Sequence, residues 1–220
     1  MQYNSWLYLF PFLGGSLILY YLLPIKRRWI GLLFSSLLFY ILTMKSLVVV
    51  VLFTTAAIYL GARVIEQFNE TFKLKKKELD RATRKELKNK TTTKIRYVIA
   101  FLCFINFGIL FVTKYFNFFG ENINALFNAL HIPAQIPFLN IFLPLGISFY
   151  TLSAISYVTD VARGVCKVER NYLRLLLFLI FFPVITEGPI SRYGQLGEEL
   201  KAEHRFDYKQ FCFGAQLITW

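Results

Sequence analysis

Two otherwise apolar stretches in the second half of the chain carry side chains that could do chemistry. The first stretch runs from Phe142 to Gly164 and holds Ser148, Tyr150, Ser156, Tyr157 and Asp160. Hydroxyl groups that recur along one helical face could hydrogen-bond a polar substrate inside a membrane. They could also bond their own backbone or tighten helix packing. Taken alone, the stretch favours the packing role.

The second stretch runs from Phe181 to Tyr193 and places Glu187, Arg192 and Tyr193 after a proline, Pro183. Ionisable groups at membrane depth are functional candidates, because burying a charge away from water is costly. Non-helical backbone is tolerated there only where protein buries it or where it lines a watery cavity. An ordinary interfacial loop explains these residues equally well when they are considered alone.

Other reactive residue types are sparse in the sequence. His131 and His204 are the only histidines, and neither has a neighbour in sequence that would activate it, so both are interpreted as structural. Cys103, Cys166 and Cys212 lie far apart without a CxxC pair, which argues against a disulfide framework or a zinc site. We expect neither a metal site nor a bound cofactor.

The composition indicates a membrane protein. Hydrophobic residues make up 56% of the chain, with 24 Phe and 13 Tyr, whereas soluble domains are about 45–50% apolar. The formal net charge is +12, which alone could suggest a nucleic-acid partner. Basic residues also gather on the cytoplasmic loops of membrane proteins. We therefore predict an all-α, polytopic transmembrane helical protein with no nucleic-acid partner.

Uncharged runs predict how helices position these residues. We expect three transmembrane helices within residues 1–62, followed by a basic segment at 63–96 and a third region at 97–220. The expected spans are Trp6–Leu23, Trp29–Met44, Ser46–Ala62, Tyr97–Thr113 and Phe138–Val158. Pro144 and Gly146 fall inside the last of these, which predicts a kink or a helix start there. Leu175–Thr186 is too short for a straight span and predicts a broken or re-entrant helix. A further span begins at Phe211.

The segment 63–96 differs from its surroundings. It holds twelve basic and five acidic residues, a net charge of +7. Such a segment is typical of a solvated cytoplasmic helix, and it could also attract anionic lipid headgroups. Placing Lys26–Arg28, residues 63–96 and the basic loop 160–174 on the cytoplasmic side leaves the N-terminus outside.

Together, the two apolar stretches resemble the membrane-bound O-acyltransferase family. The first carries LPLGISFYT, ISY and DVARG between Leu143 and Gly164, and the second carries FFP and GPISRY between Phe181 and Tyr193. The resemblance covers mainly Lys114–Trp220. It is strongest to the bacterial branch that acetylates alginate and other polysaccharides, and a D-alanyl-transferring branch is a near relative.

The resemblance implies an enzyme of the bacterial cell membrane. Its helices would move an acyl group, expected to be acetyl, from a cytoplasmic donor to an extracellular polysaccharide or partner protein. The donor would be acetyl-CoA or an acyl carrier, acting as a substrate. Residues expected to line the substrate tunnel are Ser148, Tyr150, Ser156, Tyr157, Asp160, Glu187, Arg192 and Tyr193.

The resemblance assigns no catalytic role within residues 1–220. The family's catalytic histidine lies on later helices, so we expect it beyond Trp220, and residues 1–220 alone to be inactive. The main alternative is a D-alanyl transferase of teichoic acid modification. A non-catalytic fragment or a transporter-like scaffold would also fit broken helices with polar residues at membrane depth, although no inverted repeat is visible.

Overall fold

The chain folds into α-helices, with no strand among the residues that the structure describes. This computed structural model describes residues 11–44, 48–76, 80–138, 146–185 and 190–219. The α-helices are α1 (Leu13–Leu22), α2 (Arg28–Met44), α3 (Val48–Lys75), α4 (Arg81–Leu110), α5 (Phe116–Ala129), α6 (Ile147–Arg163), α7 (Tyr172–Ile180) and α8 (Tyr208–Thr219). The predicted all-α, membrane-type fold is confirmed.

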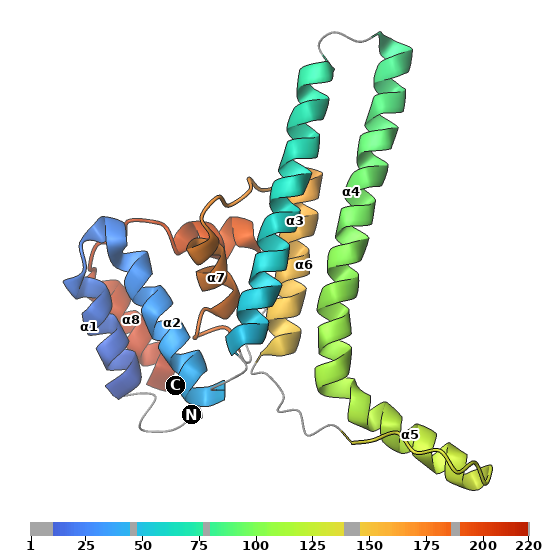
Figure 1. Cartoon of the computed structure of the whole chain (residues 1–220). Coiled ribbons are helices and arrows are strands. Elements are labelled where there is room, and N and C mark those ends of the chain that lie inside the picture. The colour runs from blue at the N-terminus through green and yellow to red at the C-terminus, as the bar shows by residue number, and fades with distance from the viewer. Residues whose placement is uncertain (1–10, 45–47, 77–79, 139–145, 186–189, 220) are drawn as a thin grey trace.

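The first two helices pack against each other and are separated by Pro24. Pro24 adopts an extended conformation, which ends α1, and a short 3₁₀ turn leads into α2. Arg28 lies over the rings of Tyr20 and Tyr21, with its Cζ 5.3 and 5.0 Å from their centroids. This cation–π contact holds the basic turn against the end of α1. Figure 1 shows α1, α2 and α8 grouped on one side of the molecule.

Helices α3 and α4 form a long hairpin that projects beyond the other helices (Figure 1). Gly61 permits their close approach, because a Cβ atom there would overlap the side chain of Leu102. Two segments, Val48–Lys75 and Ala82–Ala129, are long and apolar enough to cross a membrane, judged by length and composition. They are the two that meet this test among the described residues, so the predicted count of five spans stays a prediction.

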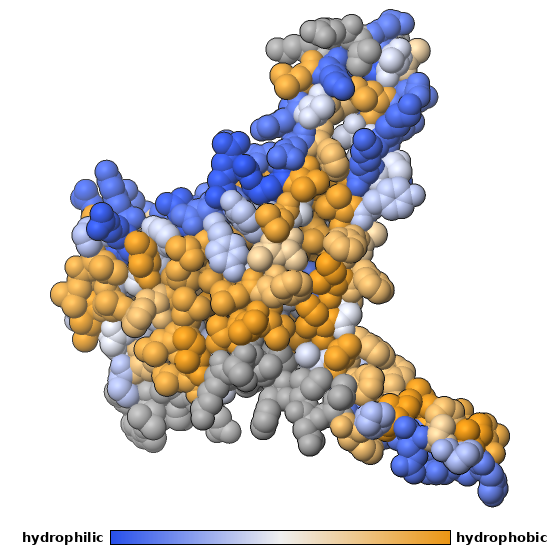
Figure 2. Space-filling view, viewed as in Figure 1, coloured by the Kyte–Doolittle hydropathy of each residue, from blue (hydrophilic) through white to orange (hydrophobic). Residues whose placement is uncertain are grey.

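Helix α3 continues without a break past Ala62, where the uncharged run of the third predicted span ends, to Lys75. The described residues of the basic segment 63–96 therefore lie mainly in the outer halves of α3 and α4. In Figure 2, hydrophilic surface covers this outer part of the hairpin, and hydrophobic surface forms a band across the body below it. Such a band is the surface expected of a protein immersed in lipid.

Helix α5 follows α4 after a π-helical turn, η4 (Phe111–Tyr115), and runs off at an angle to it (Figure 1). One face of α5 is apolar and the other polar, which suits a helix lying at a membrane surface (Figure 2). The side chain of Asn124 binds both backbone groups of Ile136, accepting from its N–H at 2.7 Å and donating to its carbonyl at 3.0 Å. These bonds hold the extended chain after α5 against the helix.

Helices α6 and α7 lie at the centre of the molecule. Helix α6 begins directly after Gly146, as the sequence predicted, and Gly146 has a positive φ of 67°. A Cβ atom at this position would collide with the backbone carbonyl of Ile185. Helix α7 has nine residues and ends before Pro183, in agreement with a short, interrupted element. The Phe182 N–H donates to the Ser36 hydroxyl at 3.3 Å, which fixes the chain after α7 against α2.

Candidate functional site

The described part of the first motif, the stretch from Phe142 to Gly164, lies mainly on α6, and its candidate residues point in different directions. Tyr150, Tyr157 and Asp160 are buried, whereas Ser148 and Ser156 are half-buried. The Tyr150 hydroxyl lies in the interior, near the side chain of Thr54 on α3. Helix α6 therefore points its two tyrosines and its carboxylate toward the protein interior. The two serines do not join them in one buried polar cluster.

The second motif is described only at its end. Glu187 lies outside the described residues. Arg192 is exposed, and Tyr193, the next residue, is buried at the start of a π-helical turn, η5 (Tyr193–Gly197). The Tyr193 ring packs 4.8 Å from the Tyr157 ring and 5.1 Å from the Phe178 ring, measured between centroids. The structure thus brings together one tyrosine from each predicted motif.

A buried carboxylate, Glu169, links these two tyrosines. The Tyr193 hydroxyl donates to Glu169 Oε2 at 2.6 Å. The backbone N–H of Glu169 donates to the Tyr157 hydroxyl at 2.9 Å. Lys201 Nζ completes the cluster 2.9 Å from Glu169 Oε2 and lies 5.0 Å from the centroid of the Tyr193 ring. We call these four residues, Tyr157, Glu169, Tyr193 and Lys201, the motif junction.

The motif junction keeps Glu169 ionised. Burial opposes the charge, but hydrogen bonds from Tyr193 and Lys201, the backbone N–H of Asn171 and the positive charge of Lys201 outweigh it, so the pKa of Glu169 is lowered from its ordinary value of 4.5. The Asn171 N–H donates to Glu169 Oε1 at 2.8 Å, so both carboxylate oxygens are bonded. A buried carboxylate with this many donors is a structural anchor for the groups that bind it.

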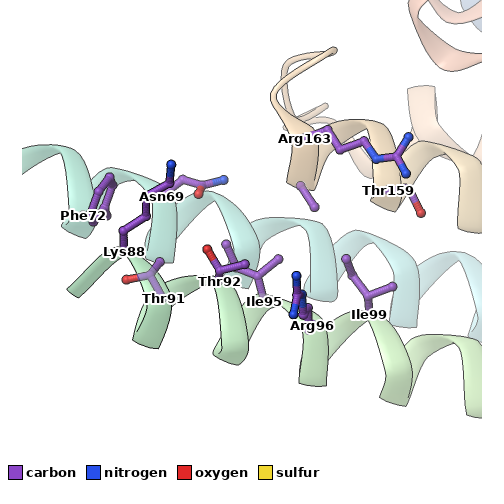
Figure 3. Close-up of a pocket in the computed structure, with 11 residues that line it drawn as sticks. Asn69, Phe72, Lys88, Thr91, Thr92, Ile95, Arg96, Ile99, Thr159 and Arg163 are labelled. Carbon is purple, nitrogen blue, oxygen red and sulfur yellow. The ribbon is translucent and has the colours of Figure 1, made fainter. Parts of the chain in front are cut away.

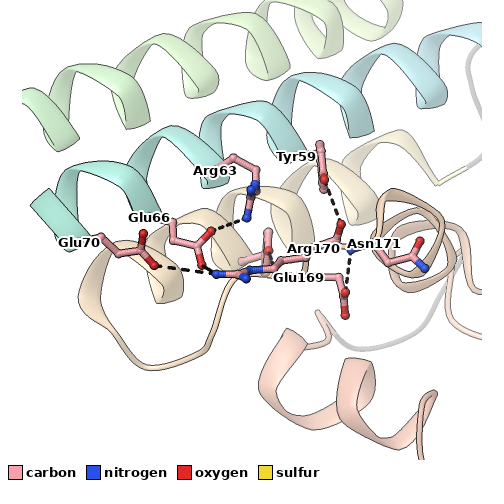
Figure 4. Close-up of polar contacts among 8 residues, drawn as sticks. Tyr59, Arg63, Glu66, Glu70, Glu169, Arg170 and Asn171 are labelled. Atoms are coloured by element: carbon pink, nitrogen blue, oxygen red, sulfur yellow. Dashed lines mark hydrogen bonds and ion pairs between the residues drawn. The ribbon is translucent and has the colours of Figure 1, made fainter.

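The loop that carries Glu169 is in turn fixed to α3 (Figure 4). Arg170 pairs with Glu66 at 3.1 Å and reaches Glu70 at 3.9 Å, and Arg63 pairs with Glu66 at 2.6 Å. The Tyr59 hydroxyl donates to the Arg170 carbonyl at 3.0 Å. The loop between α6 and α7 is thereby held at a defined position relative to the helix hairpin.

Sequence reasoning missed Glu169 and Lys201 as members of the site. Both lie in polar loops, where a charged residue is ordinary, and their proximity depends on how the chain returns after α7. One signal was present: Glu169 is one of only two acidic residues in the basic loop 160–174. An acidic residue within a basic loop is a reasonable candidate for a specific ion pair.

The two histidines both lie at the surface. His131 follows α5 in a turn with a positive φ of 55°. His204 Nε2 lies 3.0 Å from the carbonyl of Glu199, and the His204 carbonyl accepts from Arg28. No cluster of three potential metal ligands exists among the described residues. The assignment of no catalytic role to either histidine stays a prediction.

The comparisons with known proteins come from the curated sequences. The chain is 35% identical over 104 residues to the probable alginate O-acetylase AlgI of Pseudomonas syringae pv. tomato, which is 46% of this chain and 18% of the relative. It is 33% identical over 97 residues to the probable alginate O-acetylase AlgI of Pseudomonas aeruginosa, 43% of this chain and 18% of the relative. It is also 34% identical over 70 residues to the teichoic acid D-alanyltransferase of Bacillus subtilis, 31% of this chain and 18% of the relative.

These matches confirm the predicted resemblance to membrane-bound O-acyltransferases. No protein-family model matches the chain, and no solved structure matches it significantly. The matched part of the chain covers about a fifth of the length of these relatives.

Proposed function

We propose that the chain forms part of a membrane-embedded O-acyltransferase that moves an acetyl group from a cytoplasmic donor to an extracellular polysaccharide or a partner protein. The observation that carries this proposal is its similarity to five alginate O-acetylases at 33–38% identity. In the reaction, the acceptor hydroxyl oxygen bonds the acetyl carbon, the thioester C–S bond of the donor breaks, and the hydroxyl proton passes to the departing thiolate, which leaves as the thiol.

The residues of this chain would position the reacting groups. The motif junction joins α6 to the segment that carries Arg192, so it would fix the place of that exposed guanidinium. A guanidinium can bind a phosphate or carboxylate through two parallel hydrogen bonds. Arg192 would contact the donor or the acceptor. Ser148 and Ser156, which are half-buried on α6, would line the path of the acyl group.

Deletion of the gene tests the proposal. We expect ester-linked acetate on surface polysaccharide, released by mild alkali and quantified, to fall in the deletion strain and to return on complementation. Unchanged polysaccharide acetate would refute acetyl transfer. It would leave open the transporter-like or scaffold roles, in which the amount of exported polysaccharide changes rather than its acetylation.

D-alanyl transfer is the second candidate function. The similarity to teichoic acid D-alanyltransferases of two bacteria, at 34% and 39% identity, favours it. The matches to these proteins cover less of the chain, 31% and 22%, than the matches to most of the alginate O-acetylases. Ester-linked D-alanine measured in the same deletion strain distinguishes the two, since a loss of D-alanine with unchanged acetate would select this function.

A further inference from the structure

A cleft opens between α3, α4 and α6 where the hairpin leaves the body of the molecule (Figure 3). Its volume is about 520 Å³, and the cationic side chains of Lys88, Arg96 and Arg163 line it. None of its lining residues is acidic. Among the described residues, no ion pair involves any of these three cations. Cations that share one space repel each other, so an anion bound there would be stabilised.

The polar groups of the cleft suit a phosphate. Thr91 and Thr92 contribute hydroxyls and Asn69 contributes a side-chain amide, whereas the Thr159 hydroxyl donates to the Ile155 carbonyl at 2.8 Å. The four residues come from all three helices (Figure 3). Hydroxyl and amide donors beside an arginine are the groups that bind phosphate oxygens in proteins. The cleft therefore offers both charge and hydrogen-bond donors from more than one direction.

The apolar groups of the cleft indicate that the ligand is amphiphilic. Phe72, Ile95 and Ile99 also line it, on the same helices as the polar groups. Three turns beyond Arg96, on the same side of α4, the side chain of Phe107 is 44% exposed. A free phosphate would contact none of this apolar surface, whereas a phospholipid would contact both the polar groups and the apolar groups.

We propose that the cleft binds the phosphate headgroup of an anionic phospholipid, with its acyl chains lying along the exposed apolar face of α4. Arg96 and Arg163 would bind the phosphate. Lys88 lies about 12 Å further out along α4, at 1.5 Å per residue, and would contact the outer part of the headgroup. The basic segment 63–96 would then attract anionic lipids in general and also bind one lipid molecule at a defined site. This proposal is independent of the acyl-transfer reaction.

Lipid binding by the full-length, detergent-purified protein tests the proposal. The probe is fluorescent phosphatidylglycerol, with phosphatidylcholine as the neutral comparison. Each basic residue near an anionic surface contributes about 1 kcal/mol, so the double variant Arg96→Gln/Arg163→Gln should weaken phosphatidylglycerol binding about tenfold or more. Lys88→Gln alone should weaken it a few-fold, and this variant keeps the test valid if the double variant fails to fold.

The matched control is the double variant Lys94→Gln/Lys167→Gln. It removes two charges from the same end of the molecule, and neither residue lines the cleft. We expect it to weaken binding less than twofold. An equal loss in the two double variants would overturn the proposal in favour of diffuse attraction. Full displacement of the lipid by millimolar inorganic phosphate, or equal binding of phosphatidylcholine, would overturn it as well.

Discussion

At the scale of single residues, Glu169 does the most to join the two motifs. Glu169→Gln removes the charge that Tyr193 and Lys201 bind, and we expect it to lower the free energy of unfolding by about 1.5–3 kcal/mol, the range for hydrogen bonds to a buried charged group. Glu198 also pairs with Lys201, at 3.1 Å, but it is exposed. Glu198→Gln should therefore cost less than about 1 kcal/mol. Thermal unfolding in detergent compares the two variants, and equal losses would show that Glu169 has no special role.

The ionisation of Glu169 also predicts a dependence on pH. Its pKa is lower in the folded protein than its ordinary value of 4.5, because the motif junction stabilises the charged form. The stability it contributes is therefore fully present above pH 4.5 and is lost as the pH falls through the folded-state pKa. Unfolding curves of the wild type and Glu169→Gln should converge as the pH drops below about 4.5. Curves that stay parallel across that range would contradict the prediction.

Neighbouring residues in the second motif should behave differently from each other. Arg192 is exposed, so Arg192→Ala should reduce the acyl-transfer activity of the full-length protein without lowering its melting temperature. Tyr193 is buried and bonds Glu169, so Tyr193→Phe should lower the melting temperature, by an amount corresponding to about 1.5–3 kcal/mol for a lost hydrogen bond to a charged group. Activity assays on membranes and thermal unfolding distinguish these outcomes. Normal activity in Arg192→Ala would remove the case for this residue in substrate contact.

At the scale of elements, the start of α6 depends on one glycine. Gly146 and Gly164 flank the helix with similar positive φ angles of 67° and 73°. A Cβ at Gly146 would meet the Ile185 backbone, whereas nothing lies within 4 Å at Gly164. Both alanine variants bear the cost of a left-handed residue, about 1–2 kcal/mol. Gly146→Ala should cost about 1–3 kcal/mol more, because a backbone atom must move. Equal melting temperatures would show that the contact is unimportant.

The helices were more predictable than the contacts between them. The uncharged run at residues 29–44 predicted α2, and Gly146 predicted where α6 begins, because both are properties of local sequence. The continuation of α3 past Ala62 was not predicted, since a change from apolar to charged residues marks a membrane surface and not the end of a helix. The link between Tyr157 and Tyr193 through Glu169 was not predicted either, because it depends on tertiary packing of two loops.

At the scale of the whole molecule, the charged hairpin and α5 project on opposite sides of the hydrophobic band (Figure 2). Helix α4 has 30 residues and is therefore about 45 Å long, enough to cross a bilayer core of about 30 Å and extend beyond it. Basic residues concentrate on the cytoplasmic side of membrane proteins. The hairpin end should therefore face the cytoplasm, and α5 should lie at the outer surface.

Cysteine labelling tests this orientation in intact cells. The natural cysteines Cys103, Cys166 and Cys212 are first replaced by alanine, and single cysteines are then introduced as Arg84→Cys on α4 or Glu121→Cys on α5, both at exposed positions. A membrane-impermeant maleimide should label the cysteine at 121 before permeabilisation and the one at 84 only afterwards. The reverse pattern would invert the topology. Labelling of both before permeabilisation would mean that α4 does not cross the membrane, because a helix that crosses must place these two positions on opposite sides.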